Sequence, residues 1–142
     1  SSDVCSSDLE AKFHKLLDRY RDKREIEPVP CGGLMEYVEQ GILEGDELDD
    51  YLREKLKPFM DSKISSIVLG CTHYPFVKNA IEKVVGQDVD IIDGSLGTAR
   101  ELMRRLKEKD LLNDSKEKGT IEMINSSNKQ ELIDLSWKLI EM

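Results

Sequence analysis

The stretch Ile67-Val68-Leu69-Gly70-Cys71-Thr72-His73-Tyr74-Pro75-Phe76 decides how this chain is interpreted. A short apolar run ends at Gly70, and a thiol, a hydroxyl and an imidazole follow in immediate succession. Pro75 comes next, and proline is favoured in the first turn of a helix. The order predicts a strand, a reactive turn and a helix start. Ligand sites in open parallel sheets lie at that end of a strand.

Helical and strand patterns alternate on both sides of this stretch. Apolar residues at helical spacing predict helices, and short apolar runs predict strands. The expected helices cover about residues 10–20, 34–40, 47–57, 75–85 and 96–108, with a last one from about Lys129, and the expected strands cover residues 65–70, 89–92 and 120–124. This alternation predicts an α/β fold with three layers and a mainly parallel sheet.

Several residues are placed to begin or end these helices. Gly41 and Gly86 are expected to stop helices at their C-termini. Asp46 and Asn128 are expected to cap helices at their N-termini. Pro58 is expected to bend or end the helix that begins after Asp46.

Two segments are expected to be buried on particular faces. Residues 65–70 form an apolar run without alternation, which is typical of a strand covered on both faces. The helix at 96–108 is expected to turn one apolar face inward, formed by Ala99, Leu102, Met103 and Leu106. Both expectations depend on packing partners that the sequence does not name.

Composition and charge exclude several classes of protein. With 142 residues the chain can bury one sizeable core. A net charge of −8 opposes phosphate backbones, so nucleic acid is not an expected partner, and an anionic substrate would need local donors. No apolar run approaches the roughly 18 residues of a membrane span, so no membrane partner is expected.

Cysteine usage argues against a disulfide framework. The three cysteines, Cys5, Cys31 and Cys71, are an odd number without CxxC spacing. This pattern favours a reducing cytoplasm. Cys71 and His73 are two potential metal ligands, but no second pair completes a site, so no metal is expected.

The residue types after the strand have a chemistry of their own. A helix beginning near Pro75 would favour a thiolate at Cys71. His73 could donate to the sulfur, and Thr72 offers a hydroxyl and an amide to a small anion. A buried structural cysteine beside a satisfied histidine is the alternative. Spacing leaves a base, a nucleophile and a passive thiol open.

The motif Gly70-Cys71-Thr72-His73-Tyr74-Pro75 closely resembles the second cysteine motif of glutamate racemases, in the aspartate/glutamate racemase superfamily. Upstream, Val38-Glu39-Gln40-Gly41 resembles the family's Val-Glu-x-Gly segment. Downstream, Ile91-Ile92-Asp93 and Thr98-Ala99-Arg100 resemble the strand and helix that follow. The resemblance covers about Glu10 to Met142 and identifies the chain with the C-terminal half of a family member.

This resemblance implies a cofactor-independent racemisation of L-glutamate to D-glutamate for peptidoglycan synthesis in the cytoplasm. One cysteine thiolate removes the α-proton and a second thiol protonates the opposite face; a group of moderate pKa can serve in both directions. Cys71 matches the thiol on the L-glutamate side, and His73 matches the histidine that assists it. Thr72 matches a substrate-binding residue, and Glu39 an acidic residue on the same side, also expected to bind substrate.

Other positions are expected to be structural or without a role. Cys31 resembles a position where the family tends to carry a cysteine before a proline, and Gly32 replaces that proline here. Tyr74 and Pro75 are expected to shape the start of the helix. The turn at Asp93 departs from the family's commoner Asp-Ser-Gly order. His14 lies on a charged helix and is not a site candidate.

The resemblance also implies a division of the chain. Residues 1–9 repeat Ser-Ser-Asp and are expected to be a non-native leader. Residues 10–94 would form part of the second racemase domain, and residues 95–142 would complete the first. The first-half cysteine motif is not in this sequence, so the polypeptide alone is expected to be inactive. Glutamate is its expected small-molecule partner. The segment after Ser95 is expected to expose apolar surface, so further copies of the chain are also expected partners.

Three other functions remain open on these residues. Another superfamily member, such as an aspartate racemase, would share the cysteine and differ in substrate. A thiol hydrolase or transferase would form an acyl intermediate on Cys71. A non-catalytic α/β binding or assembly module would keep its role without the thiol.

Overall fold

The computed structural model describes Lys15, Asp18, Arg19 and residues 25–60 and 64–141. The chain divides into two compact units, Ser1–Pro30 and Cys31–Met142. In the first unit, residues 25–30 have no helix or strand. The expected leader at 1–9, with Cys5, and His14 lie outside the described residues, as does most of the helix expected at 10–20. The candidate site lies in the second unit.

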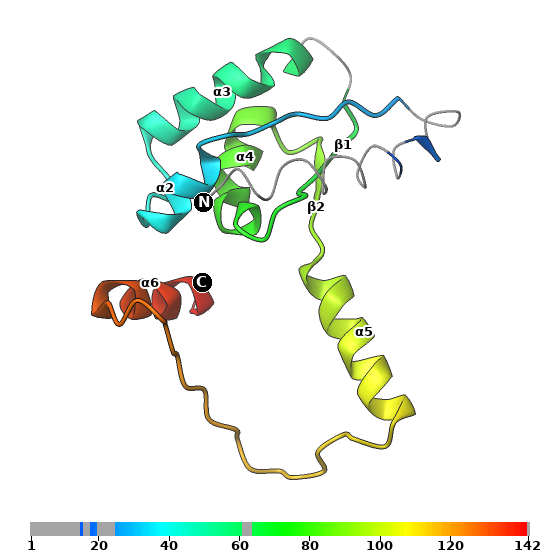
Figure 1. Cartoon of the computed structure of the whole chain (residues 1–142). Coiled ribbons are helices and arrows are strands. Elements are labelled where there is room, and N and C mark those ends of the chain that lie inside the picture. Colours follow the sequence, from blue (N-terminus) through cyan, green and yellow to red (C-terminus); the bar gives the residue numbers. More distant parts are fainter. Residues whose placement is uncertain (1–14, 16–17, 20–24, 61–63, 142) are drawn as a thin grey trace. The chain divides into compact units, whose positions relative to one another are not determined.

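The second unit contains helices and a small parallel sheet (Figure 1). The elements in chain order are α2 (Leu34–Glu39), α3 (Asp46–Met60), β1 (Ser66–Val68), the 3₁₀ helix η2 (Tyr74–Val77), α4 (Lys78–Val85), β2 (Asp90–Ile92), α5 (Ser95–Glu108) and α6 (Gln130–Ile140). Strand, helix and parallel strand follow one another in β1, α4 and β2. The α/β class predicted from the sequence is confirmed.

The hydrophobic core lies between α2, α3 and α4. Leucines at every fourth position of α3 turn one face inward, as the helical period predicted. The buried side chains are Leu34, Val38, Leu48, Leu52, Leu56, Leu69, Val77, Ala80, Ile81 and Val84. Burial of a leucine of this kind contributes about 2 kcal/mol, so this cluster holds α2, α3 and α4 together.

The sheet is smaller than the sequence predicted. β1 and β2 pair in parallel with Ile67 opposite Ile91, and the Leu69 amide continues the ladder to the Ile92 carbonyl at 2.8 Å. The expectation that β1 is covered on both faces is wrong, because Val68 is 71% exposed. Residues 120–124 do not form the predicted strand. Their backbone has no strand beside it among the described residues, and a strand exists only when it is paired.

The helix ends predicted from glycines agree with the structure, and the boundaries predicted from other residues agree less well. Gly41 has φ 74°, its amide binds the Val38 carbonyl at 2.9 Å, and the Ile42 amide binds the Tyr37 carbonyl at 2.8 Å. These two bonds form a Schellman motif that ends α2, as predicted. Gly86, with φ 91°, ends α4.

Three predicted helix boundaries are wrong by a few residues. Asp46 is the first residue of α3 rather than its cap, and Pro58 lies inside α3, which continues to Met60. The residue that caps α6 is Lys129 rather than Asn128. Because Pro58 is in the last turn of α3, it removes a single hydrogen bond there instead of breaking the helix.

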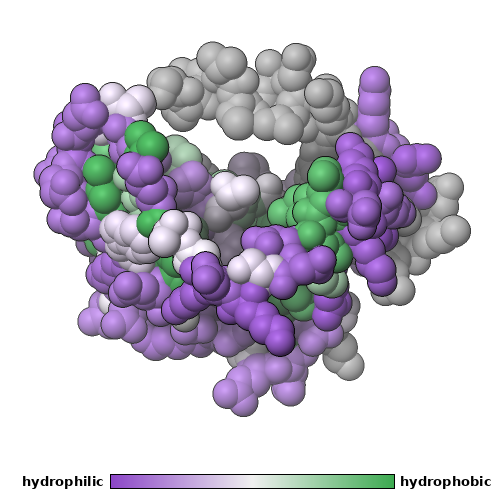
Figure 2. Space-filling model, turned by 90° about the horizontal axis from the view of Figure 1, so that it is seen from below, coloured by the Kyte–Doolittle hydropathy of each residue, from purple (hydrophilic) through white to green (hydrophobic). Residues whose placement is uncertain are grey.

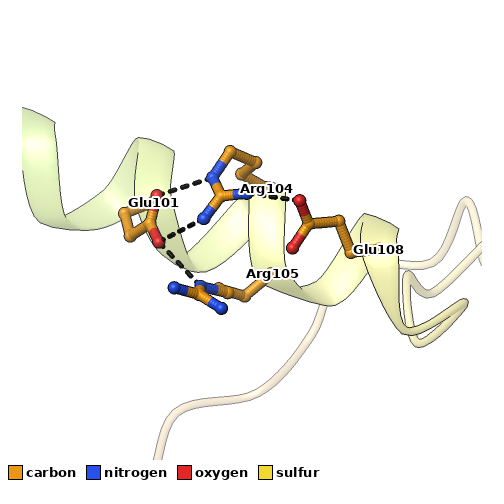
Figure 3. Close-up of polar contacts among 4 residues, drawn as sticks. All are labelled: Glu101, Arg104, Arg105 and Glu108. Atoms are coloured by element: carbon orange, nitrogen blue, oxygen red, sulfur yellow. Dashed lines mark hydrogen bonds and ion pairs between the residues drawn. The ribbon is translucent and has the colours of Figure 1, made fainter.

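α5 has no buried residue, so the inward-facing stripe expected at Leu102 and Met103 is not covered: these side chains are 60% and 59% exposed. Figure 2 shows hydrophobic side chains (green) at the surface among hydrophilic ones (purple). Ion pairs within α5 join Glu101 to Arg104 and Arg105, and Arg104 to Glu108 (Figure 3). Such pairs support a helix that lacks a packing partner.

No helix in the described part of the chain is long and apolar enough to cross a membrane.

Candidate active site

The predicted reactive turn begins just beyond β1. Leu69 is buried and holds the end of the strand to β2, and the chain then turns through Gly70 to His73. The Tyr74 amide binds the Cys71 carbonyl at 3.3 Å and the Phe76 amide binds the His73 carbonyl at 3.2 Å. The helix predicted near Pro75 starts as the 3₁₀ helix η2, and α4 begins only at Lys78. The α-helical N-terminus is therefore further from Cys71 than the sequence predicted.

His73 lies between the thiol and a carboxylate. The Sγ atom of Cys71 is 3.6 Å from Nδ1 of His73. On the other side of the ring, Nε2 is 3.8 Å from Oε1 of Glu39. At 3.8 Å the Glu39 carboxylate is within ion-pair distance of Nε2 but beyond hydrogen-bond distance. In the tautomer that carries its proton on Nε2, Nδ1 is the acceptor toward the thiol. The three side chains together form a thiol–imidazole–carboxylate chain.

The fold explains how Glu39 reaches this position. Glu39 is the last residue of α2, and the Schellman motif at Gly41 fixes where the helix ends. The buried side chains Leu34 and Val38 seat α2 on the core, and η2 packs against α2. The sequence predicted Glu39 as a site residue; the structure places its carboxylate at the imidazole.

Thr72 lies between Cys71 and His73 in the chain and is exposed. Cys71 and His73 are both half-buried, with the His73 side chain 32% exposed. The four predicted residues Cys71, Thr72, His73 and Glu39 therefore lie together at a surface that a small molecule can reach. The Glu39 side chain beside His73 is 57% exposed and therefore stays in contact with solvent.

An open groove of about 550 Å³ lies on the Glu39 side of the imidazole. Its lining combines α2, His73 and α6, with the side chains Glu36, Val38, Glu39, Gln40, His73, Asn125, Leu132, Leu135, Ser136 and Leu139. The α6 residues were not predicted as part of the site. Their spacing at 132, 135 and 139 predicts an apolar helix face, but nothing local says which surface that face meets.

Two tyrosine hydroxyls bind consecutive carbonyls near the site. Tyr74 donates to the Cys31 carbonyl at 3.3 Å, and Tyr51 of α3 donates to the Gly32 carbonyl at 2.9 Å. Burial, with the Cys31 and Cys71 thiols nearby, raises the pKa of Tyr74 to about 12. Burial also raises the pKa of the Cys31 thiol, against an opposing effect of Lys55, so Cys31 is a poorer acid than an exposed cysteine.

The turn at Asp93 is occupied by its own hydrogen bond. Oδ1 of Asp93 accepts from the Ser95 amide at 2.8 Å. The Ser95 side chain and, second, this amide lower the pKa of Asp93 by hydrogen bonding to its carboxylate. The carboxylate therefore serves the start of α5. Among the described residues, no group of three or more His, Cys, Asp or Glu side chains is arranged to hold a metal ion.

Comparison with known proteins relates the chain to one family. No protein-family model matches the chain. Over 131 residues, 92% of this chain, it is 55% identical to the glutamate racemase of Clostridium perfringens. The chain is a relative of the glutamate racemases. It is also 50% identical over 132 residues, 93% of the chain, to the glutamate racemase of Clostridium botulinum strain Alaska E43.

The structural comparison leads to the same family. A crystal structure of glutamate racemase from Francisella tularensis in complex with D-glutamate is 35% identical, with a TM-score of 0.61, over 71% of this chain and 38% of that one. The two clostridial matches cover 50% and 51% of the relatives. This glutamate racemase relative thus spans about half the length of the curated relatives it matches, and the resemblance predicted from the cysteine motif is confirmed.

Proposed function

We propose that Cys71 is one of two acid/base thiols of a cofactor-independent glutamate racemase. The Cys71 thiolate takes the α-proton of L-glutamate, and the bonding pair remains on the α-carbon. A second thiol on the opposite face gives its proton to that carbon, which yields D-glutamate. The observation that carries the proposal is the 3.6 Å contact between Cys71 Sγ and His73 Nδ1.

The imidazole makes the thiol usable in both directions. When Nδ1 accepts the thiol proton, Cys71 becomes the thiolate that acts as the base. When the imidazolium returns that proton, Cys71 becomes the acid for the reverse reaction. Glu39, 3.8 Å from Nε2, stabilises the imidazolium between the two steps. Glu39 thus supports His73 in addition to the substrate-binding role predicted for it.

Substrate recognition has to come from local donors. Glutamate carries two carboxylates, and a net charge of −8 does not attract them. The exposed Thr72, next to Cys71, offers its hydroxyl and amide to the α-carboxylate. The choice of glutamate is supported by the names of the clostridial relatives and by D-glutamate in the Francisella complex. D-glutamate for peptidoglycan synthesis in the cytoplasm is the corresponding cellular role.

The surface of α5 supports a division of the enzyme between this chain and further sequence. Residues 10–94 would form part of the second racemase domain, which carries Cys71, and residues 95–142 would complete the first domain. In that arrangement the exposed Leu102 and Met103 are covered by the other part of the enzyme. A polypeptide of these 142 residues alone holds one wall of the site, so it racemises glutamate poorly or not at all.

A chimaera tests the proposal. The chain is fused to the part of the Clostridium perfringens racemase that it does not match, and L-glutamate is supplied in D₂O. The expected result is D-glutamate with deuterium at the α-carbon, lost in Cys71→Ser and retained in Cys31→Ser. Turnover that survives Cys71→Ser would refute the role of Cys71.

The same assay separates the remaining alternatives. Faster turnover of aspartate than of glutamate in a panel of acidic amino acids would reassign the substrate. A covalent acyl adduct on Cys71 without α-deuterium would indicate a thiol hydrolase or transferase. The 142-residue chain alone is the control. Racemisation by that control at the rate of the chimaera would contradict the requirement for a second wall.

A further inference from the structure

The Cys31 carbonyl joins the reactive turn to the helix that carries Glu39. It accepts the Leu34 amide at 3.1 Å, the bond that starts α2. It also accepts the Tyr74 hydroxyl at 3.3 Å, from the residue that follows His73. One backbone oxygen therefore connects the beginning of α2 to the end of the reactive turn.

A second tyrosine fixes the same short segment from the other side. Tyr51 of α3 donates to the Gly32 carbonyl at 2.9 Å. Tyr51 and Tyr74 come from different elements and bind consecutive carbonyls, Cys31 and Gly32. We call this pair of bonds the carbonyl clamp. Leu48 and Leu52 pack α3 into the core. The clamp therefore links the reactive turn, through residues 31 and 32, to a helix that the core holds in place.

The reactive turn needs such an attachment, because its own residues are not buried in the core. Leu69 before it and Val77 after it are buried, but the residues from Gly70 to Phe76 are exposed or half-buried. In the described part of the chain the sheet has two strands, and its ladder ends at Leu69. The contact from Cys71 to His73 and the contact from His73 to Glu39 are both longer than 3.5 Å. Small movements of the turn against α2 would break one or the other.

We propose that Tyr74 is a positioning residue: its hydroxyl, bound to the Cys31 carbonyl, holds the reactive turn against α2 so that His73 stays between Cys71 and Glu39. The role rests on the proposed function, because it acts through the acid/base pair. A tyrosine that must donate has to remain protonated, and burial raises the pKa of Tyr74 to about 12, so its hydroxyl keeps its proton over the whole pH range of the test.

The test measures how fast Cys71 reacts, because the thiolate is the reactive form. The 142-residue chain is treated with iodoacetamide between pH 5 and pH 10, and alkylation of the Cys71 peptide is followed by mass spectrometry, separately from Cys31 and Cys5. The variants are His73→Gln, Tyr74→Phe and the double variant. Tyr51→Phe releases the other half of the clamp and carries the test if Tyr74→Phe does not fold.

The control is Tyr37→Phe, which removes a hydroxyl bound to Glu47 at 3.2 Å on the surface of the same unit. The expected result is a change in the Cys71 alkylation rate at pH 7 of roughly threefold to tenfold in Tyr74→Phe, the equivalent of one hydrogen bond. The change has the same direction as in His73→Gln. In the double variant, Tyr74→Phe adds little, because both changes act through one contact.

Each outcome decides between the proposals. A shifted profile in His73→Gln with unshifted profiles in Tyr74→Phe and Tyr51→Phe would overturn the clamp and leave the proposed function standing. An unshifted profile in His73→Gln would overturn the acid/base pair and with it the clamp. An equal shift in Tyr37→Phe would show general loosening of the unit and would also overturn the clamp.

Discussion

Lys83 of α4 forms an ion pair with Asp49 of α3, whose side chain is 2% exposed. The pair joins the two helices that enclose most of the core, and Arg53 approaches the same carboxylate oxygen at 4.0 Å. The other oxygen of Asp49 is buried without a hydrogen-bond partner among the described residues. A buried carboxylate in this position depends on its cation, because desolvation is tolerable only where an opposite charge is near.

Lys83→Met is therefore expected to lower the free energy of unfolding more than Lys78→Met does. Lys78 pairs with Glu82 on the same helix at 3.9 Å, and both side chains are exposed, so its loss is close to neutral. Urea denaturation of the two variants measures the difference. Equal midpoints would mean that Arg53 or water already compensates Asp49 and that the Lys83 pair is dispensable.

Gly41→Ala is expected to destabilise the unit by about 1 kcal/mol, because the left-handed backbone at φ 74° strains any residue with a Cβ. The new Cβ would also lie 3.4 Å from Leu135 of α6. The matched control is Gly97→Ala, inside α5 with no atom near the new Cβ, which should be neutral or slightly stabilising. Thermal unfolding followed by circular dichroism compares them. A neutral Gly41→Ala would argue against the Schellman motif.

Leu102→Asp is expected to leave the unfolding midpoint unchanged and to reduce self-association and dye binding. Leu102 is 60% exposed on α5, and apolar patches of this kind promote association. Leu52→Ala is the contrasting change, since Leu52 is 1% exposed and its loss should cost about 3 kcal/mol. Sedimentation velocity and urea denaturation report the two effects. A monodisperse, dye-silent parent chain would contradict the first expectation.

Stability is expected to fall as the pH rises from about 10 toward 12. The ordinary pKa of tyrosine is 10.0, and burial raises that of Tyr74 to about 12. A group whose pKa is higher in the folded chain binds its proton more tightly there, so its contribution is present below the unfolded pKa and is lost as the pH rises through the folded value. Tyr74→Phe should flatten the pH dependence of the urea midpoint in this range. An unchanged slope would contradict the burial of Tyr74.

Local patterns were enough to predict several residues that the structure brings together at the candidate site. The apolar run before Gly70, the residues Cys71 to Pro75 and the leucine spacing of α3 each carry their information within a few positions of the chain. Gly41 and Gly86 predicted helix ends because a positive φ is a property of a single residue. The family resemblance, read from the same short motifs, was confirmed by comparison over nearly the whole chain.

The tertiary structure alone decided which of these patterns find partners. The apolar stripe of α5 and the segment at 120–124 have the right local pattern and no neighbour to bury or pair with in the described chain. Glu39 meets His73, and Tyr74 meets the Cys31 carbonyl, across 34 and 43 positions of sequence (73 − 39 and 74 − 31). Periodicity and backbone preference are short-range properties that a sequence displays directly. Contacts between distant segments depend on how the helices pack around a shared core, and that packing is set only when the whole unit folds.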